Sequence, residues 1–96
     1  MVKLPTVQTN QATAQAIRDG AVENKEVRIR YRDDKDKISE RSIEPYEMKN
    51  GKLFGYCINK GGIRAFKTTG IEVAVVTDKP FKPRFPVQIT EQTYIK

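Results

Sequence analysis

The sequence has 96 residues, enough for one domain with a modest core. Its single cysteine, Cys57, cannot form an intramolecular disulfide, and we expect it to be a buried small hydrophobe. The sequence has no histidine, so the usual base for a thiol nucleophile and the usual zinc ligands are missing. No spacing of carboxylates, lysines or tyrosines indicates a catalytic pair. We therefore expect a non-enzymatic protein with no cofactor and no metal.

The net charge of +6 is concentrated in one part of the chain. Residues 1–24 and 25–48 each balance to zero, whereas residues 49–84 carry eight basic and two acidic side chains. A localised positive field favours nucleic acid, a nucleotide or an acidic protein as partner. The alternative is that these lysines only keep exposed strands soluble.

Hydropathy gives no sign of a membrane protein. No apolar run approaches the ~20 residues of a membrane span. The N-terminus turns polar at once, which is unlike a signal peptide. These patterns predict a cytoplasmic protein without membrane contact.

The first part of the chain predicts an arm and a short helix. Residues 1–8 are expected to form a flexible arm. Alanines favour a helix over residues 11–19, with Thr9 or Asn10 as its cap. Gly20 is predicted to end this helix.

Residues 26–32 alternate between apolar and basic side chains, which is the period of a half-buried strand. Acidic residues follow in the turn at 33–36 and at Glu40. We expect cross-strand pairs between these acids and the arginines, which makes this a solvated face.

The second predicted strand, residues 37–44, contains an inconsistency. Ile38 and Ile43 are an odd number of residues apart and cannot share a face without a bulge. Arg41 shares a face with Ile43. Either Arg41 points inward toward a pocket, or the strand is irregular. Pro45 limits pairing, as at an edge or a bend.

The centre of the predicted sheet is residues 51–66. Strands are expected at 52–58 and 63–67, joined by a turn that contains paired glycines. A core strand is predicted at 71–77, which is apolar and strongly β-branched.

The prolines of residues 78–86 cannot continue a ladder. We expect this segment to be extended and to be anchored to the rest of the β domain by Phe81 and Phe85. Residues 87–96 are expected to add an edge strand or to be disordered.

These elements predict a mainly β fold. About five antiparallel strands with short turns would leave one face of an open sheet bare, unless the sheet closes into a small barrel. We therefore predict an SH3-like or Sm-like barrel with one N-terminal helix across an end.

The ordered residues of these strands resemble the WYL domain. The resemblance rests on the spacing of the following residues: Ala16-Ile17, Val27-x-Ile29-x-Tyr31, Arg41-x-Ile43-x-Pro45, Leu53-x-Gly55-Tyr56-Cys57, Arg64-x-Phe66-Lys67 and Ile71. It implies an SH3-like barrel with a preceding helix, and a free-standing regulatory module of bacterial or phage type that senses nucleic acids or nucleotide-like ligands. It places one WYL-like domain at residues 9–86 and a C-terminal extension at 87–96.

The sequence also departs from the family pattern. The namesake Trp-Tyr-Leu falls on Gly51-Lys52-Leu53, and the family's Asp-Arg-Ile falls on Thr69-Gly70-Ile71. The resemblance therefore implies the loss of one pocket arginine, with Arg41 and Arg64 retained.

Two functions remain open from the sequence. The first is binding of single-stranded nucleic acid or a nucleotide, without catalysis. Its predicted site consists of the basic residues Arg41, Lys52, Arg64 and Lys67, with Tyr56 (or Tyr46) stacking on a base. The second is a protein-interaction adaptor with a degenerate ligand pocket, which binds a protein partner or self-associates through free strand edges.

Overall fold

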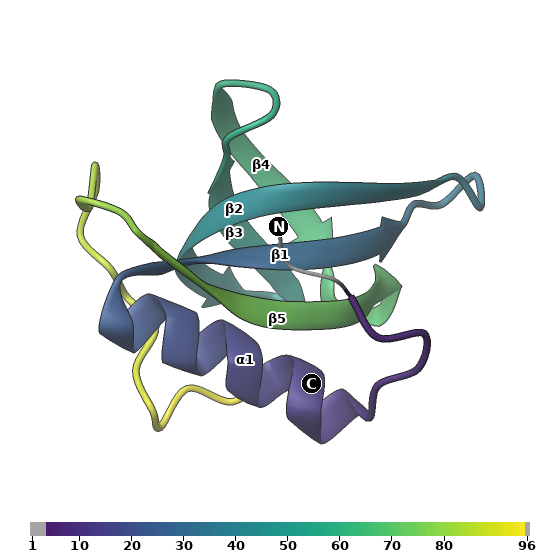
Figure 1. Cartoon of the computed structure of the whole chain (residues 1–96), viewed down its shortest axis with the longest axis horizontal. Helices are drawn as coiled ribbons and strands as arrows, with labels where there is room; N and C mark the ends of the chain where they lie inside the picture. Colours follow the sequence, from purple (N-terminus) through teal and green to yellow (C-terminus); the bar gives the residue numbers. More distant parts are fainter. Residues whose placement is uncertain (1–3, 96) are drawn as a thin grey trace.

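The computed structural model describes residues 4–95, and Figure 1 shows a curved sheet with one helix against it. The sheet has five antiparallel strands in the order β4-β3-β2-β1-β5. This confirms the predicted mainly β fold with one N-terminal helix. The elements in chain order are α1 (Asn10–Glu23), β1 (Lys25–Arg32), β2 (Ile38–Lys49), β3 (Lys52–Cys57), β4 (Gly62–Lys67), the 3-10 turn η1 (Thr68–Gly70) and β5 (Ile71–Pro80).

Helix α1 is one turn longer than predicted. Thr9 is its N-cap and accepts from the Ala12 N–H, while Asn24 ends it in the left-handed conformation with φ 55°. The prediction that Gly20 ends the helix is wrong. Gly20 is buried inside α1, where an added Cβ would lie 2.2 Å from Val27 Cγ2. The glycine lets the helix lie directly on β1, so it serves packing and does not terminate the helix.

Strand β2 continues to Lys49, so the prediction that it ends at Glu44 is wrong. Pro45 lies opposite Gly55, and a bulge between Pro45 and Glu47 shifts the register. The bulge accommodates the proline, which has no N–H to donate to the ladder, and pairing with β3 resumes after it.

The strands present two different faces. The inner face carries the fully buried side chains Val27, Ile29, Ile43, Leu53 and Cys57, which pack with Ile17 and Ala21 of α1. The outer face carries the residues between them in each strand, because successive side chains of a strand alternate. The main hydrophobic core therefore lies on the inner side of the sheet, between the strands and α1.

The sheet is open, with β4 and β5 as its edges, and η1 connects them. The Tyr31 hydroxyl accepts from the Lys67 N–H at 3.1 Å, and the Tyr31 ring packs edge-to-face on Phe66. An added Cβ at Gly70 would lie 2.4 Å from the Arg32 carbonyl oxygen. These contacts hold the β4 end of the sheet against β1 without a ladder between β4 and β5.

The segment after β5 is docked on the domain and is not a strand. Phe81 and Phe85 pack edge-to-face on Tyr46, with ring centroids 5.8 Å and 5.4 Å apart. This agrees with the expected anchoring by phenylalanines. The segment then passes along α1, where Arg18 donates to the Thr93 carbonyl, and Ile89 is buried in the core (Figure 1).

In the described part of the chain, α1 is the only α-helix, and it is too short and too polar to cross a membrane.

Candidate anion-binding site

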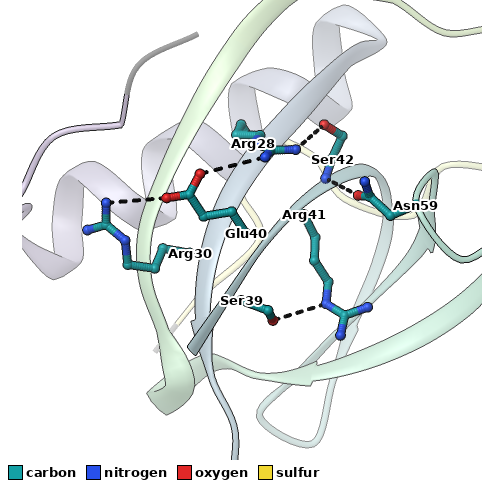
Figure 2. Close-up of polar contacts among 7 residues, drawn as sticks. All are labelled: Arg28, Arg30, Ser39, Glu40, Arg41, Ser42 and Asn59. Atoms are coloured by element: carbon teal, nitrogen blue, oxygen red, sulfur yellow. Dashed lines mark hydrogen bonds and ion pairs between the residues drawn. The ribbon is translucent and has the colours of Figure 1, made fainter. Parts of the chain in front are cut away.

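Arg41 lies on the inner face of the sheet. It is paired with Ile29, a fully buried residue of β1, which settles the question raised by the sequence in favour of an inward side chain. Its Nε donates to Ser39 Oγ at 3.2 Å, and its Nη1 lies 3.7 Å from Cys57 Sγ. Figure 2 shows the Arg41 side chain extending away from the Arg28 side chain, which lies on the opposite side of the β1–β2 hairpin. A half-buried guanidinium therefore lies at the border of the core.

Arg64 lies on the same inner face, two residues from the buried Phe66 in β4. Its cross-strand partner is Gly55, and the neighbouring pair on this face is Cys57 with Gly62. Neither glycine has a side chain, and an added Cβ at Gly62 would meet no atom within 4 Å. Arg41 contacts Cys57, and Arg64 is paired with Gly55. The Cys57–Gly62 pair therefore lies between the two arginines along the sheet.

Neither of these two arginines forms an ion pair with any carboxylate of residues 4–95. The arginines of β1 behave differently. Arg28 and Arg30 lie 3.6 Å and 3.7 Å from the two Glu40 oxygens on the outer face (Figure 2), and Arg32 donates to Glu72 at 2.8 Å. This confirms the predicted cross-strand neutralisation of the arginine row. The inner face thus keeps its positive charge, while the outer face of β1 does not.

The pKa values of two outer-face groups show the same neutralisation. The hydrogen bond to the Glu72 carboxylate raises the pKa of Arg32. The hydrogen bond to Asp34 raises the pKa of Lys67 in the same way. Each cation already has an anionic partner within the chain.

The other three predicted site residues do not share the inner face. Lys52, Tyr56 and Lys67 lie on the outer side of β3 and β4, because they alternate with the inward residues. Lys67 Nζ lies 2.9 Å from Asp34, and the Arg84 guanidinium covers the Tyr56 ring at 3.9 Å. Lys52 is exposed. The structure thus divides the predicted set into an inner pair and an outer group.

A polar cluster on the outer face was missed by the sequence interpretation. Glu44 is buried and accepts from the Tyr46 hydroxyl at 2.6 Å and from Arg84 Nε at 3.1 Å. The Arg84 N–H also donates to the Tyr46 hydroxyl at 2.9 Å. Burial, together with the hydrogen bond to Glu44, raises the pKa of Tyr46 to about 12. Arg84 is 40 residues from Glu44, and no local pattern connects them.

Comparisons with known proteins agree with the fold. The model of the WYL domain matches residues 12–76, so the chain belongs to the WYL domain family. Among solved structures, it is similar to proteasome accessory factor B/C (PafBC) of Arthrobacter aurescens, with a TM-score of 0.62 and 22% sequence identity. The similarity covers 91% of this chain but only 16% of that one. Comparison with curated proteins found no match.

Proposed function

We propose that this chain is a non-enzymatic, ligand-sensing regulatory domain that binds the phosphates of a nucleic acid or nucleotide on its inner face. Arg41 and Arg64 are the binding residues. The observation that carries the proposal is that these two arginines lack a carboxylate partner among residues 4–95, whereas every arginine of β1 has one. Guanidinium groups without an internal partner suit phosphate oxygens.

The surroundings of Arg41 support this role. Its hydrogen bond to Ser39 and its contact with Cys57 position the guanidinium without neutralising it. The side chain is half-buried, so solvent screens its charge less than that of a fully exposed lysine. Such a group contributes more to binding an anion than a surface cation does.

Membership of the WYL family supports the regulatory part of the proposal, because the resemblance implies sensing of nucleic acids or nucleotide-like ligands. The solved relative is named a proteasome accessory factor, and its likeness to this chain concerns the fold. Gly70 stands where the resemblance implies another arginine, and it packs closely on Arg32 and Tyr31. We therefore expect fewer phosphate contacts than a family member with that arginine makes.

Fluorescence anisotropy with a labelled single-stranded oligonucleotide at low salt tests the proposal. We expect salt-sensitive binding that Arg64→Glu weakens by about tenfold or more, because reversal replaces an attraction with a repulsion. Lys35→Glu is the matched control, because it changes the net charge equally in the exposed β1–β2 turn.

Equal losses for both variants would mean that only the overall charge matters, and the inner-face site would be rejected. Absence of binding to DNA, RNA and nucleotides at low salt would reject the proposal as a whole.

A further inference from the structure

The two edges of the sheet differ in how their backbone groups are satisfied. At the β5 edge, the side-chain amide of Gln8 accepts from the Ala74 N–H at 2.7 Å and donates to the Ala74 carbonyl at 2.9 Å. The N-terminal arm therefore caps this edge as a neighbouring strand would. At the other edge, β4 pairs only with β3 among the strands of the described chain.

The direction of the β4 backbone groups follows from one hydrogen bond. The Lys67 N–H donates to the Tyr31 hydroxyl and so points away from β3. In an antiparallel strand, alternate residues direct their N–H and C=O groups to the same side. Ile63 and Ala65 therefore direct theirs outward, where no described residue is paired with them. This is the arrangement that accepts an added strand.

The side chains beside this edge also indicate what the added strand contains. On the outer face, Ile63 is 47% exposed and lines a cavity of about 300 Å³ with Phe54 and Phe85. On the inner face, Arg64 is exposed and has no described carboxylate partner. A strand paired with β4 places alternate side chains on these two faces. Apolar side chains would meet the cavity, and acidic ones would meet Arg64.

Charge excludes a second copy of β4 as the favoured occupant. Residues 49–71 contain five basic and no acidic side chains. Pairing β4 with another β4 would bring like charges together across the new ladder, which is destabilising. An acidic segment has the complementary charge.

We propose that the β4 edge is a docking surface for an extended acidic segment of a partner protein, which adds to the sheet as a further strand. The added strand alternates acidic and apolar side chains. This interaction shares Arg64 with the proposed binding of phosphates. It differs because it also requires the outward backbone groups of Ile63 and Ala65, which phosphate binding does not use, so Ala65→Pro should weaken peptide binding and leave oligonucleotide binding unchanged.

The test uses a blocked peptide of alternating glutamate and valine that is long enough to span β4, with the lysine and valine counterpart as control. We expect the glutamate peptide to bind at low salt and to slow hydrogen exchange at the Ile63 and Ala65 amides, as seen by NMR. Ala65→Pro removes one outward N–H and should weaken binding by about fivefold or more. Ala65→Ser retains that N–H and is the matched control.

A second measurement keeps the test independent of the folding of Ala65→Pro. N-methylation of alternate residues of the peptide blocks one of its two backbone edges, so one methylated series should bind and the other should not. The proposal is overturned by any of four results: no binding of the glutamate peptide, equal binding of the lysine peptide, equal binding of both methylated series, or exchange protection outside β4. Protection of the same amides that rises with protein concentration alone would assign the edge to a second copy and also overturn it.

Discussion

The inner and outer faces of the sheet use arginine in opposite ways. On the outer face, Arg28 and Arg30 share Glu40, and Arg84 pairs with the buried Glu44. On the inner face, Arg41 and Arg64 have no carboxylate partner in residues 4–95, although the chain has twelve acidic residues.

The difference separates stabilising charges from charges that are free to bind. A cation that is paired within the chain already has its charge partly neutralised, so an anionic ligand must compete with that partner. Partial burial of a cation without such a partner costs desolvation free energy, but the cation remains able to bind an external anion. We therefore propose that binding takes place on the inner face, whereas the ion pairs of the outer face link β1 to β2 and the tail to β2.

The largest expected effect is on the outer face, at Glu44. Glu44→Ala should lower the free energy of unfolding by about 2–4 kcal/mol, because the buried Tyr46 hydroxyl and the Arg84 guanidinium lose their shared acceptor and a cavity opens beneath the tail. Urea unfolding followed by circular dichroism measures this change.

Glu40→Ala is the control for that measurement. The Glu40 side chain is 46% exposed and lies 3.6 Å and 3.7 Å from its arginines, so we expect a loss below about 1 kcal/mol. Equal losses for the two variants would show that the Glu44 cluster does not fix the tail more firmly than a surface pair does.

The next expected effect is the pH dependence that Tyr46 produces. In the unfolded chain tyrosine has a pKa of about 10, while in the folded protein the pKa of Tyr46 is raised to about 12. Between these values the folded state keeps a proton that the unfolded state loses. The contribution of Tyr46 is therefore fully present below the unfolded pKa and is lost as the pH rises through the folded pKa, by at most about 2–3 kcal/mol.

Unfolding at a series of alkaline pH values measures this loss. Tyr46→Phe removes the titrating hydroxyl, so its stability should fall less steeply over this window than that of the unmodified protein. Tyr94→Phe is the control, because the Tyr94 side chain is exposed, and it should retain the original slope. If both phenylalanine variants keep the original slope, the hydroxyl of Tyr46 is not the group responsible.

The smallest expected effect on stability is on the inner face. Arg41→Met keeps a long apolar stem and removes a guanidinium that has no carboxylate partner, so the free energy of unfolding should change by less than about 1 kcal/mol. The same variant should bind the oligonucleotide at least about fivefold more weakly. A stability loss above about 2 kcal/mol would show that Arg41 has a structural role like that of the outer-face arginines.

Much of the sheet was predictable because its determinants are local. The alternation of residues 26–32, the turn with paired glycines after β3 and the β-branched run of β5 identify strands without tertiary information. The same reasoning failed at Gly20 and at Pro45. Glycine often ends a helix and proline often ends a strand. Here the helix continues through Gly20, which packs on Val27, and β2 continues past Pro45 through the bulge before Glu47.

The candidate site was only partly predictable. Composition and resemblance selected five residues. However, the face that a side chain occupies depends on whether it is an odd or an even number of residues from the buried side chains of its strand. The alternation places Arg41 and Ile43 on the inner face, and it places Lys52, Tyr56 and Lys67 on the outer face. The partners Asp34 and Arg84 come from distant segments, so the sequence did not indicate that Lys67 and Tyr56 are occupied.

By itself the sequence determined the fold class, the family and the basic character of residues 49–84, because local periodicity, ordered spacing and composition require no knowledge of contacts. The sequence also predicted that the arginines of β1 are neutralised, but only the tertiary structure decided which cations of residues 49–84 are. Ion pairs form between segments brought together by sheet curvature and by docking of the tail, as Arg84 with Glu44 shows. The two arginines on the inner face are distinguished by where the acids lie in space, and this position is set by the packing of the whole domain.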